Sequence, residues 1–251
     1  MYLNRYMVVS MGKYVLIKTK EGLLRGLKTL YYRWKGSDPP NDLLLLKPIR
    51  EDVSPWINYT WWRNPAPGVP AEFFAIAWLG FIYVDKAGVY RFYVTTDDGS
   101  RVWVDGKLLI DAWKDQPPTT YVSEPIPLSE GYHRLKYYFY NRYAFAQAVL
   151  GWIPQEGEAG VIPKDRFYHV ISDRVFFEGV PEDYTVEVLP SGAEKKICIS
   201  RGGVCGIRVL FDELPMEAIV RVLDTSGGVV YETPEKITLW GGDEIKLAEI
   251  K

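Results

Sequence analysis

Two adjacent carboxylates, Asp97 and Asp98, stand directly before Gly99 and between two apolar segments. Adjacent carboxylates repel each other unless a cation neutralises them. One interpretation is therefore a site for a hard cation, because such an ion prefers several oxygen ligands. The other interpretation is a turn between two strands, in which the aspartates accept backbone N–H groups and the glycine takes a positive φ. These residues alone leave both interpretations open.

Catalytic chemistry is disfavoured by the residue types present. Hydrolysis of a glycosidic bond needs two carboxyl groups about 5–10 Å apart across a cleft, whereas Asp97 and Asp98 are neighbours in the chain. The sequence has two histidines, His133 and His169, which excludes a histidine-rich metal site and argues against a histidine-based triad. A Gly-rich loop that would cradle a phosphate is absent from the sequence. We therefore expect a protein that is not an enzyme.

The two cysteines, Cys198 and Cys205, have a spacing that fits a β-hairpin. If Arg201-Gly202 forms the turn, the cysteines face each other on paired strands, within range of a disulfide. We predict this disulfide; two reduced, buried thiols are the alternative. A disulfide would indicate an oxidising compartment or the cytosol of a hyperthermophile. Two thiols without other soft ligands do not make a zinc site.

The composition is that of a globular protein. The chain has 251 residues, of which 47% are hydrophobic and 25% charged, and this length can bury a substantial core. The net charge of −2 argues against nucleic acid as a partner. The longest apolar run, 73–84, is too short to span a bilayer. No secretory signal is visible, so the chain is exported by another route, has lost a leader, or is an intracellular or virion protein. We expect an extracellular or surface-exposed location, a virion surface included. The scarcity of Asn and Gln suggests a thermophilic source.

Short β-strands separated by turn residues account for nearly the whole chain, which predicts an all-β protein. The expected strands are 14–18, 73–84, 89–95, 101–104, 108–110, 133–140, 148–152, 174–177, 184–189, 195–200, 205–211, 218–224, 229–232, 237–239 and 244–250. Asp105-Gly106 predicts a type I′ hairpin, because this dipeptide tolerates positive φ values. The only short helix that the pattern allows is Glu21–Leu30.

A polar, Pro/Gly-rich stretch at 154–160 marks a domain boundary between residues 154 and 172. We expect an N-terminal strand or extension over 1–20, a first β-sandwich over 21–169 and a second, smaller β-sandwich over 170–251. About eighty residues with eight short strands suffice for such a sandwich.

The first domain resembles a known family. The segment 88–92 reads Gly-x-Tyr-x-Phe, and Asp97-Asp98-Gly99, an apolar strand and Asp105-Gly106 follow it. This order is similar to that of the protective-antigen-type domain, first described in a bacterial toxin and also found in glycosidases and yeast adhesins. Further matching segments, in the order of that family, are 22–32, 77–82, 110–113, 128–133, 140–141 and 150–152. The resemblance covers about residues 21–169 and implies a protective-antigen-type β-sandwich.

In the yeast adhesins of this family, paired aspartates joined by a cis peptide bind calcium. The resemblance thus implies Ca²⁺ as a cofactor, held by the carboxylates of Asp97 and Asp98 and by Asn141. It also implies that the backbone carbonyls of Tyr143 and Phe145 complete the set. Together these groups supply most of the six to eight oxygens that calcium prefers.

The same branch uses its metal to help hold the hydroxyls of a sugar, so the implied partner is a glycan or a cell-surface polysaccharide. The expected glycan-binding residues are Asp97, Asp98, Trp113, Asn141, Arg142 and Tyr143. An aromatic face packs on a pyranose, and polar side chains hydrogen-bond its hydroxyls. For Trp113, partial burial against the sandwich is the alternative role. We expect Trp103, which lies between two valines, in the core.

Two functions remain in competition. The first is a non-catalytic, calcium-assisted carbohydrate-binding module that resembles an adhesin. The second is a structural or assembly subunit of a virion, filament or surface layer. In that case residues 1–20 or the C-terminal strand would pair with a neighbouring copy, giving a homo-oligomer.

Overall fold

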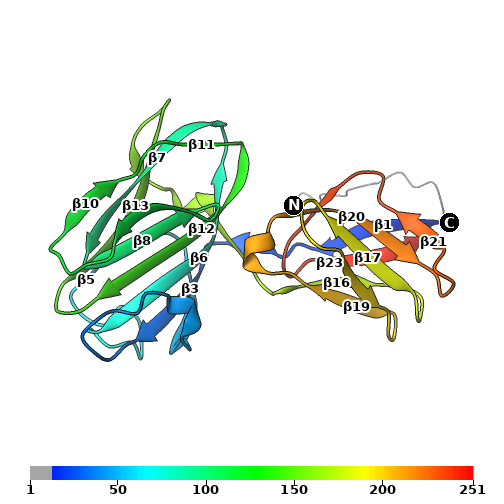
Figure 1. The fold of residues 1–251 in the computed structure, drawn as a ribbon, viewed down its shortest axis with the longest axis horizontal. Coiled ribbons are helices and arrows are strands. Elements are labelled where there is room, and N and C mark those ends of the chain that lie inside the picture. Colours follow the sequence, from blue (N-terminus) through cyan, green and yellow to red (C-terminus); the bar gives the residue numbers. More distant parts are fainter. Residues whose placement is uncertain (1–12, 251) are drawn as a thin grey trace. The chain divides into compact units, whose positions relative to one another are not determined.

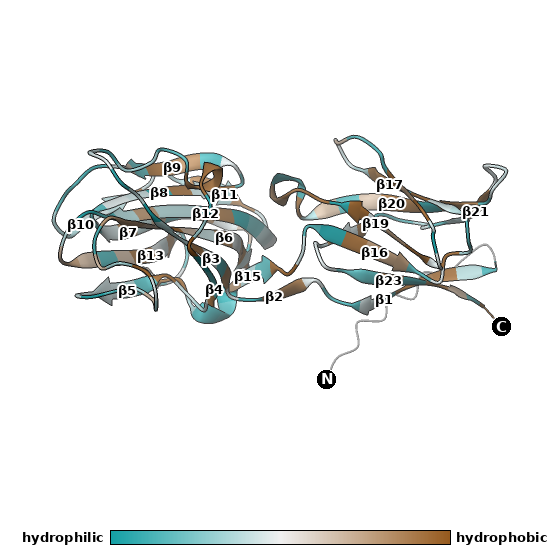
Figure 2. Cartoon of the chain, turned by 90° about the horizontal axis from the view of Figure 1, so that it is seen from below, coloured by the Kyte–Doolittle hydropathy of each residue, from teal (hydrophilic) through white to brown (hydrophobic). Residues whose placement is uncertain are grey.

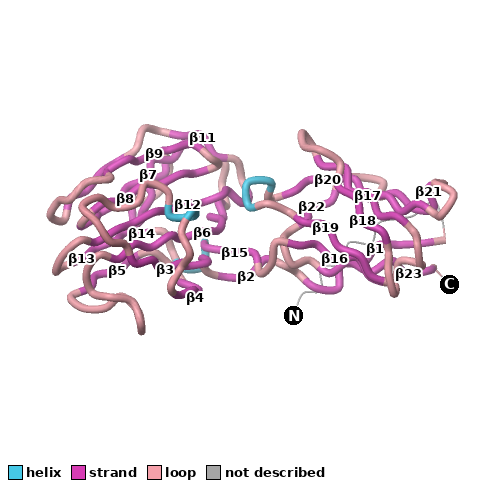
Figure 3. The backbone as a smooth tube through the Cα atoms, turned by 60° about the horizontal axis from the view of Figure 1, so that its bottom comes forward, coloured by secondary structure: helices cyan, strands magenta, loops and turns pink. Residues whose placement is uncertain are grey.

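The structure, a computed structural model, describes residues 13–250. Strands make up almost all of its regular structure, and the helical segments are single turns (Figure 3). These turns are η1 (Leu43–Leu45), η2 (Lys164–Arg166) and η3 (Phe211–Glu213). The all-β prediction is therefore confirmed. The chain divides into two compact units, one formed by residues 25–169 and the other by the segments before and after them.

Residues 25–169 form two sheets that pack face to face (Figure 1). The first sheet has the order β15-β6-β12-β8-β9, with β3 also beside β6 and β4 beside β3. Its strands are β3 (Leu27–Arg33), β4 (Arg50–Ser54), β6 (Phe74–Val84), β8 (Gly99–Val104), β9 (Lys107–Ala112), β12 (Gly131–Asn141) and β15 (Phe167–Val170). The second sheet has the order β10-β7-β13-β14, with β11 beside β7 and β5 beside β13. Its strands are β5 (Asn58–Trp61), β7 (Gly88–Asp97), β10 (Thr119–Val122), β11 (Ile126–Leu128), β13 (Ala146–Pro154) and β14 (Gly160–Val161). Short strand β2 (Leu23–Arg25) contains the N-terminal boundary of this unit.

Strand β12 is apolar on both faces because each face is covered. Tyr137 and Phe139 belong to the core between the two sheets, whereas Tyr138 and Tyr140 pack in a second cluster with Trp34. Successive side chains of a strand point to opposite faces, so the strand alternates between two hydrophobic layers rather than between core and solvent. This double coverage explains the long apolar runs of the sequence.

The position of Trp103 differs from the sequence expectation. Its neighbours Val102 and Val104 lie in the core between the sheets, so the period of two turns the Trp103 side chain to the other face. There its ring packs against Tyr138 at 5.0 Å, at the edge of the second cluster. Trp103 is therefore partly buried outside the main core.

The helix expected over Glu21–Leu30 is absent. Gly26, at φ +94°, separates β2 from β3, and β3 pairs with β4 and β6. Tertiary pairing overrides the weak local helix signal at this place. The hairpin prediction at Asp105-Gly106 is confirmed, because both residues have positive φ values, 50° and 80°.

The other unit also has two sheets. One has the order β1-β23-β16-β19, and the other has the order β18-β17-β20-β21 with β22 beside β20. Its strands are β1 (Tyr14–Lys20), β16 (Arg174–Glu178), β17 (Thr185–Pro190), β18 (Lys196–Ile199), β19 (Val204–Arg208), β20 (Met216–Leu223), β21 (Val229–Glu232), β22 (Ile237–Leu239) and β23 (Glu244–Glu249). Every second residue of β16 and of β20 is buried. Hydrophobic and hydrophilic residues both occur along these strands (Figure 2).

Residues 14–20 belong to this unit rather than to a separate extension. Strand β1 pairs antiparallel with β23, from Tyr14 opposite Glu249 to Lys20 opposite Glu244. The assembly hypothesis expects the N-terminal segment or the C-terminal strand to pair with a neighbouring copy. In the structure β1 and β23 pair with each other, and β1 has one unpaired edge within the described sheet. Residues 1–12 of the expected extension lie outside the described residues.

Cys198 and Cys205 are joined by a disulfide, with Cα atoms 5.7 Å apart. The register that we used to predict this bond is nevertheless wrong. Gly202 and Gly203, both at positive φ, form the turn, and Arg201 pairs with Val204. The cysteines do not share a hairpin ladder, because β18 lies in one sheet of this unit and β19 in the other. The disulfide therefore links the two sheets.

Candidate functional site

Two connections cross between the sheets of residues 25–169 at the same end. Strands β7 and β13 are neighbours in one sheet, with Asp97 opposite Gln147. Strands β8 and β12 are neighbours in the other, with Gly99 opposite Tyr140. The crossing from β7 to β8, through Asp98, therefore lies beside the crossing from β12 to β13, through 142–145. Distant parts of the sequence meet at this point because both strand pairs end together.

Asp97 and Asp98 are both largely buried in the first crossing, and the peptide bond between them is cis. Burial raises the pKa of Asp97 to about 6, and the neighbouring Asp98 adds to the rise. No hydrogen bond to the Asp97 carboxylate occurs within residues 13–250. Burial also raises the pKa of Asp98, against the lowering effect of its backbone hydrogen bonds. The pair therefore concentrates negative charge that its protein partners only partly balance.

The Asp98 carboxylate connects two loops. Its Oδ2 accepts a hydrogen bond from the backbone N–H of Arg142 (2.8 Å), and its Oδ1 accepts one from the N–H of Gln116 (3.1 Å). The Gln116 side-chain amide also donates to the backbone carbonyl of Asp98 (3.0 Å). These partners are 18 and 44 residues away, so Asp98 does more than close its own turn.

Gly99 serves close packing rather than a positive φ. It does not have the left-handed conformation that the turn interpretation predicts. A Cβ atom at this position would lie 2.2 Å from Cε1 of Tyr140, in the neighbouring strand β12. The absence of a side chain thus lets the Tyr140 ring pack against the backbone of Gly99.

A buried chain of hydroxyls supports the crossing at Asp98. Thr96 Oγ1 donates to the carbonyl of Asp98 (2.9 Å), Ser100 Oγ lies 2.7 Å from Thr96 Oγ1, and Tyr137 Oη lies 2.8 Å from Ser100 Oγ. Each hydroxyl has one proton. Because Thr96 uses its proton on Asp98, Ser100 must donate to Thr96 and Tyr137 must donate to Ser100. The direction of the whole chain is therefore fixed, and it ends at the Asp98 peptide.

Asn141 ends β12 and is fully buried. Its Nδ2 donates to the carbonyl of Ala71 (3.3 Å), which fixes the orientation of the amide. Its Oδ1 is buried and has no hydrogen-bond partner among the described residues. A buried acceptor without a partner carries a desolvation penalty of about 1–3 kcal/mol, so a bound ion or an ordered water at Oδ1 would be stabilising.

Arg142 and Asp115 form the polar rim of the site. Arg142 Nε lies 2.6 Å from Asp115 Oδ2, and the hydroxyl of Tyr140 donates to Asp115 Oδ1 (2.7 Å). Burial, followed by the hydrogen bond to Asp115, raises the pKa of Tyr140. The Arg142 guanidinium also donates to the carbonyl of Ser37. Arg142 is thus held in place from two sides.

The remaining predicted residues are Trp113, in the loop after β9, and Tyr143 and Phe145, in the second crossing. Trp113 is partly buried, with its ring 4.8 Å from that of Tyr140 and with Arg101 over it at 5.0 Å. Tyr143 is exposed in the second crossing. Phe145 lies two residues further on, and its ring packs edge-on against Trp62. The structure therefore brings Asp97, Asp98, Asn141 and Arg142 together, while Trp113 and Tyr143 lie around them.

The described residues contain no group of three or more His, Cys, Asp or Glu side chains that could hold a metal ion. A cation at Asp97 and Asp98 therefore needs amide and carbonyl oxygens as well. The unpaired Oδ1 of Asn141 and the raised pKa of Asp97 are features that a hard cation would satisfy. The donor set thus fits calcium.

No helix of the described chain is long and apolar enough to cross a membrane.

Sequence reasoning missed the residues that hold the aspartates. These are Thr96 and Gln116, together with Ser100, which bonds Thr96, and Asp115, which holds Arg142. A usable signal was the pair of hydroxyl residues that flank Asp97-Asp98-Gly99 between apolar strands. For Asp115 and Gln116 the only signal was their position after Trp113, because they contact residues that are distant in the sequence.

Comparisons with known proteins agree with this architecture. Over 118 residues the chain is 34% identical to the anti-sigma-I factor RsgI3 of Acetivibrio thermocellus, a match that covers 46% of this chain and 18% of that protein. The chain thus spans a small part of that relative. An anti-sigma factor domain-containing protein of known structure has a TM-score of 0.52 at 17% identity, covering 86% of this chain and 99% of that one.

A PA14 sugar-binding domain from an RTX adhesin also has a TM-score of 0.52 at 17% identity, covering 58% of this chain and 99% of that one. At these identities, the structural comparisons show a shared fold. The family model described as PA14 domain matches residues 25–166, which is more than half of the chain and almost all of the unit that contains the aspartates. The chain therefore belongs to the PA14 domain family, as the resemblance in its sequence implied.

Proposed function

We propose that this chain is a non-catalytic carbohydrate-binding module in which calcium at Asp97, Asp98 and Asn141 takes part in holding the sugar. The observation that carries the proposal is the buried, unpaired Oδ1 of Asn141 in the crossing next to two largely buried carboxylates. The structural neighbour named as a sugar-binding domain of an adhesin supports a sugar as the ligand.

In this proposal the ion is held by the carboxylates of Asp97 and Asp98, Oδ1 of Asn141, and the backbone carbonyls of Tyr143 and Phe145. Bound calcium would supply open coordination positions for hydroxyls of a sugar. The protein contributes a fixed frame, because Asp98 is held by two backbone N–H groups and its peptide by Thr96.

The residues around the ion site suit a sugar. The Arg142 guanidinium, oriented by Asp115, offers N–H donors to hydroxyls, and the exposed ring of Tyr143 offers an apolar face. Trp113 has a partly buried ring and is a candidate for the opposite rim. We infer a glycan or surface polysaccharide as the partner, and an extracellular or surface-exposed place of action. The disulfide between Cys198 and Cys205 supports that location.

The test is sugar binding with and without calcium. A glycan array is probed with the full chain in millimolar calcium and again after chelation. Asp97→Asn removes one charge without breaking a hydrogen bond, and Asp111→Asn, in the exposed ion pair with Arg101, is the matched control. Signals that require calcium, disappear in Asp97→Asn and persist in Asp111→Asn are expected. Signals that survive chelation would refute the calcium role, and an empty array would refute the function.

A further inference from the structure

Four consecutive leucines, Leu43 to Leu46, form the turn η1 and its C-terminal cap between β3 and β4. Leu43 is fully buried in the second cluster, with Trp34 and Tyr138. Leu45 is 83% exposed, more than any other large hydrophobic residue of the described chain, and both of its neighbours are exposed as well. Exposed apolar residues that lie together, unlike scattered ones, mark a site of interaction.

The outward direction of these leucines follows from the geometry of the turn. Residues three apart lie on the same side of a 3₁₀ turn, so the burial of Leu43 directs Leu44 and Leu45 away from the core. Asp42 caps the turn, because its Oδ1 accepts hydrogen bonds from the N–H of Leu44 (3.0 Å) and from the hydroxyl of Tyr138 on β12 (2.8 Å). The fold therefore holds the leucines toward solvent.

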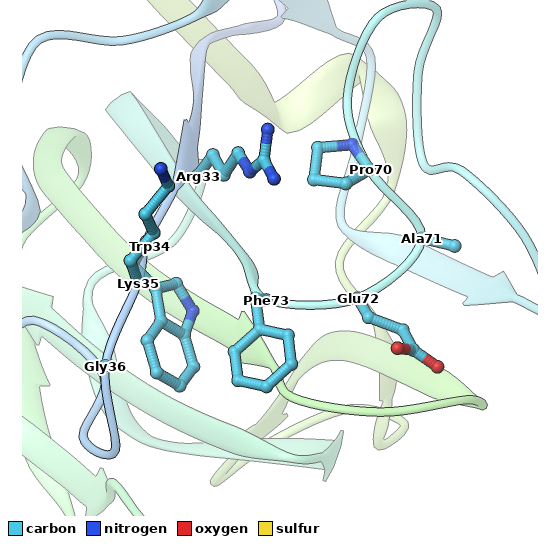
Figure 4. A pocket seen from close by; sticks show the side chains of 8 residues that line it. All are labelled: Arg33, Trp34, Lys35, Gly36, Pro70, Ala71, Glu72 and Phe73. Atoms are coloured by element: carbon cyan, nitrogen blue, oxygen red, sulfur yellow. The ribbon is translucent and has the colours of Figure 1, made fainter.

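The segment that carries η1, residues 34–49, has positively charged side chains at both ends. Lys47 directly follows the last leucine, and Lys35 lies next to Arg33, where the segment leaves β3 beside the pocket of Figure 4. All three are exposed, and none forms an ion pair among the described residues. Of the two carboxylates of the segment, Asp42 is held by the cap, so that Asp38 is the only one without such a role.

The strands beside the segment add no unpaired negative charge. The acidic residues of β3, β4, β8 and β9 all form ion pairs, which are Lys28–Glu51, Arg50–Asp52 and Arg101–Asp111. The Arg101 guanidinium also donates to the carbonyl of Asn41 (3.2 Å), directly before the cap. The surroundings of the leucines thus suit a neutral or anionic surface better than a cationic one.

The size of the apolar surface indicates what kind of partner covers it. A stable interface between two proteins uses about 20–30 residues of each partner, whereas three exposed leucines form this surface. A lipid bilayer requires no matching shape. A few apolar side chains that enter its interfacial layer, with a cation at the level of the phosphates, give weak and reversible binding.

We propose that η1 is a membrane-docking turn, in which Leu44, Leu45 and Leu46 enter the interfacial layer of a lipid bilayer and Lys47 contacts lipid phosphates. The inference does not depend on the proposed sugar site. It adds a lipid surface to the partners of the chain, and it assigns a role to leucines that the packing of the fold does not require.

Flotation with lipid vesicles tests the turn. The full chain is mixed with vesicles of phosphatidylcholine, with and without phosphatidylglycerol, in the presence of a chelator. These lipids carry no sugar, and the chelator removes calcium, so the candidate ion site does not contribute. Leu45→Ser removes the most exposed leucine and leaves Leu43 in place, and Lys47→Gln removes the adjacent cation. Ile197→Ser, at an isoleucine of β18 that is 59% exposed, is the matched control.

We expect the wild type and Ile197→Ser to bind vesicles that contain phosphatidylglycerol. The partition coefficient should fall at least tenfold (roughly) in Leu45→Ser, because that leucine no longer leaves water. Lys47→Gln should lower it roughly fivefold, and only where phosphatidylglycerol is present. No binding by the wild type, or equal binding by Leu45→Ser and Ile197→Ser, would overturn the proposal. A dimer in solution that Leu45→Ser dissociates, without vesicle binding, would assign the turn to a second copy instead; the proposed sugar site would stand in each case.

Discussion

Ser100 should matter more to stability than Tyr137, although the tyrosine is the far larger side chain. Tyr137→Phe removes the first donor of the hydroxyl chain and leaves Ser100 and Thr96 still bonded, so it should cost about 1 kcal/mol. Ser100→Ala removes two hydrogen bonds and leaves the fully buried Tyr137 hydroxyl without a partner. It should cost about 2–4 kcal/mol, because an orphaned buried donor adds its desolvation penalty.

The double variant gives the sharper test. In the Ser100→Ala background the buried Tyr137 hydroxyl has a desolvation cost and no hydrogen bond to offset it. Adding Tyr137→Phe removes that cost, so it should be neutral or stabilising. Urea unfolding followed by tryptophan fluorescence measures these changes, and eight of the nine tryptophans lie in residues 25–169. The reasoning about the chain fails if Tyr137→Phe alone destabilises as much as Ser100→Ala, or if the two effects simply add.

Two further predictions concern other parts of the chain. The Cys198–Cys205 disulfide closes a loop of sequence separation 7, and its reduction should lower the free energy of unfolding of its unit by about 2.5 kcal/mol. Calorimetric melting with and without reductant measures this effect. An unchanged melting temperature would contradict the prediction. The hydrogen bond to Asp105, more than any other effect, raises the pKa of His133. The protonated pair therefore stabilises the fold below about pH 6.5 and ceases to do so as the pH rises through the folded pKa. Asp105→Asn, which tolerates the positive φ, should flatten the melting temperature between pH 5.5 and 8.5; parallel curves for both proteins would disprove it.

Local sequence pattern was sufficient to predict most strands and the Asp105-Gly106 hairpin. Alternating residues and turn dipeptides act over a few positions, so their signals are visible without the fold. The pattern could not show which strands share a sheet. Hence the disulfide between Cys198 and Cys205 was predicted from a hairpin ladder that does not exist, and residues 14–20 were assigned to an extension rather than paired with β23.

At the candidate site, sequence reasoning could identify side chains but not their supports. Asp97, Asp98 and Asn141 were chosen through a family resemblance, and their proximity depends on two crossings that only the sheet order brings together. Gly99 was expected at a positive φ, whereas contact with Tyr140 explains it. The surroundings of Trp34 and Phe73 could not be predicted, because a bulky phenylalanine rarely takes a positive φ and nothing in the sequence marks this one.

The most direct test of the ion site is calcium titration by calorimetry on chelator-stripped protein. The account predicts binding at one site in the wild type and in Asp111→Asn, and its loss in Asp97→Asn, whose carboxylate has no other partner within residues 13–250. Calcium at a hundred times its dissociation constant should also stabilise the wild type by about 2.7 kcal/mol, seen as a higher melting temperature. The absence of heat and of any melting shift at millimolar calcium, or undiminished binding by Asp97→Asn, would contradict the account.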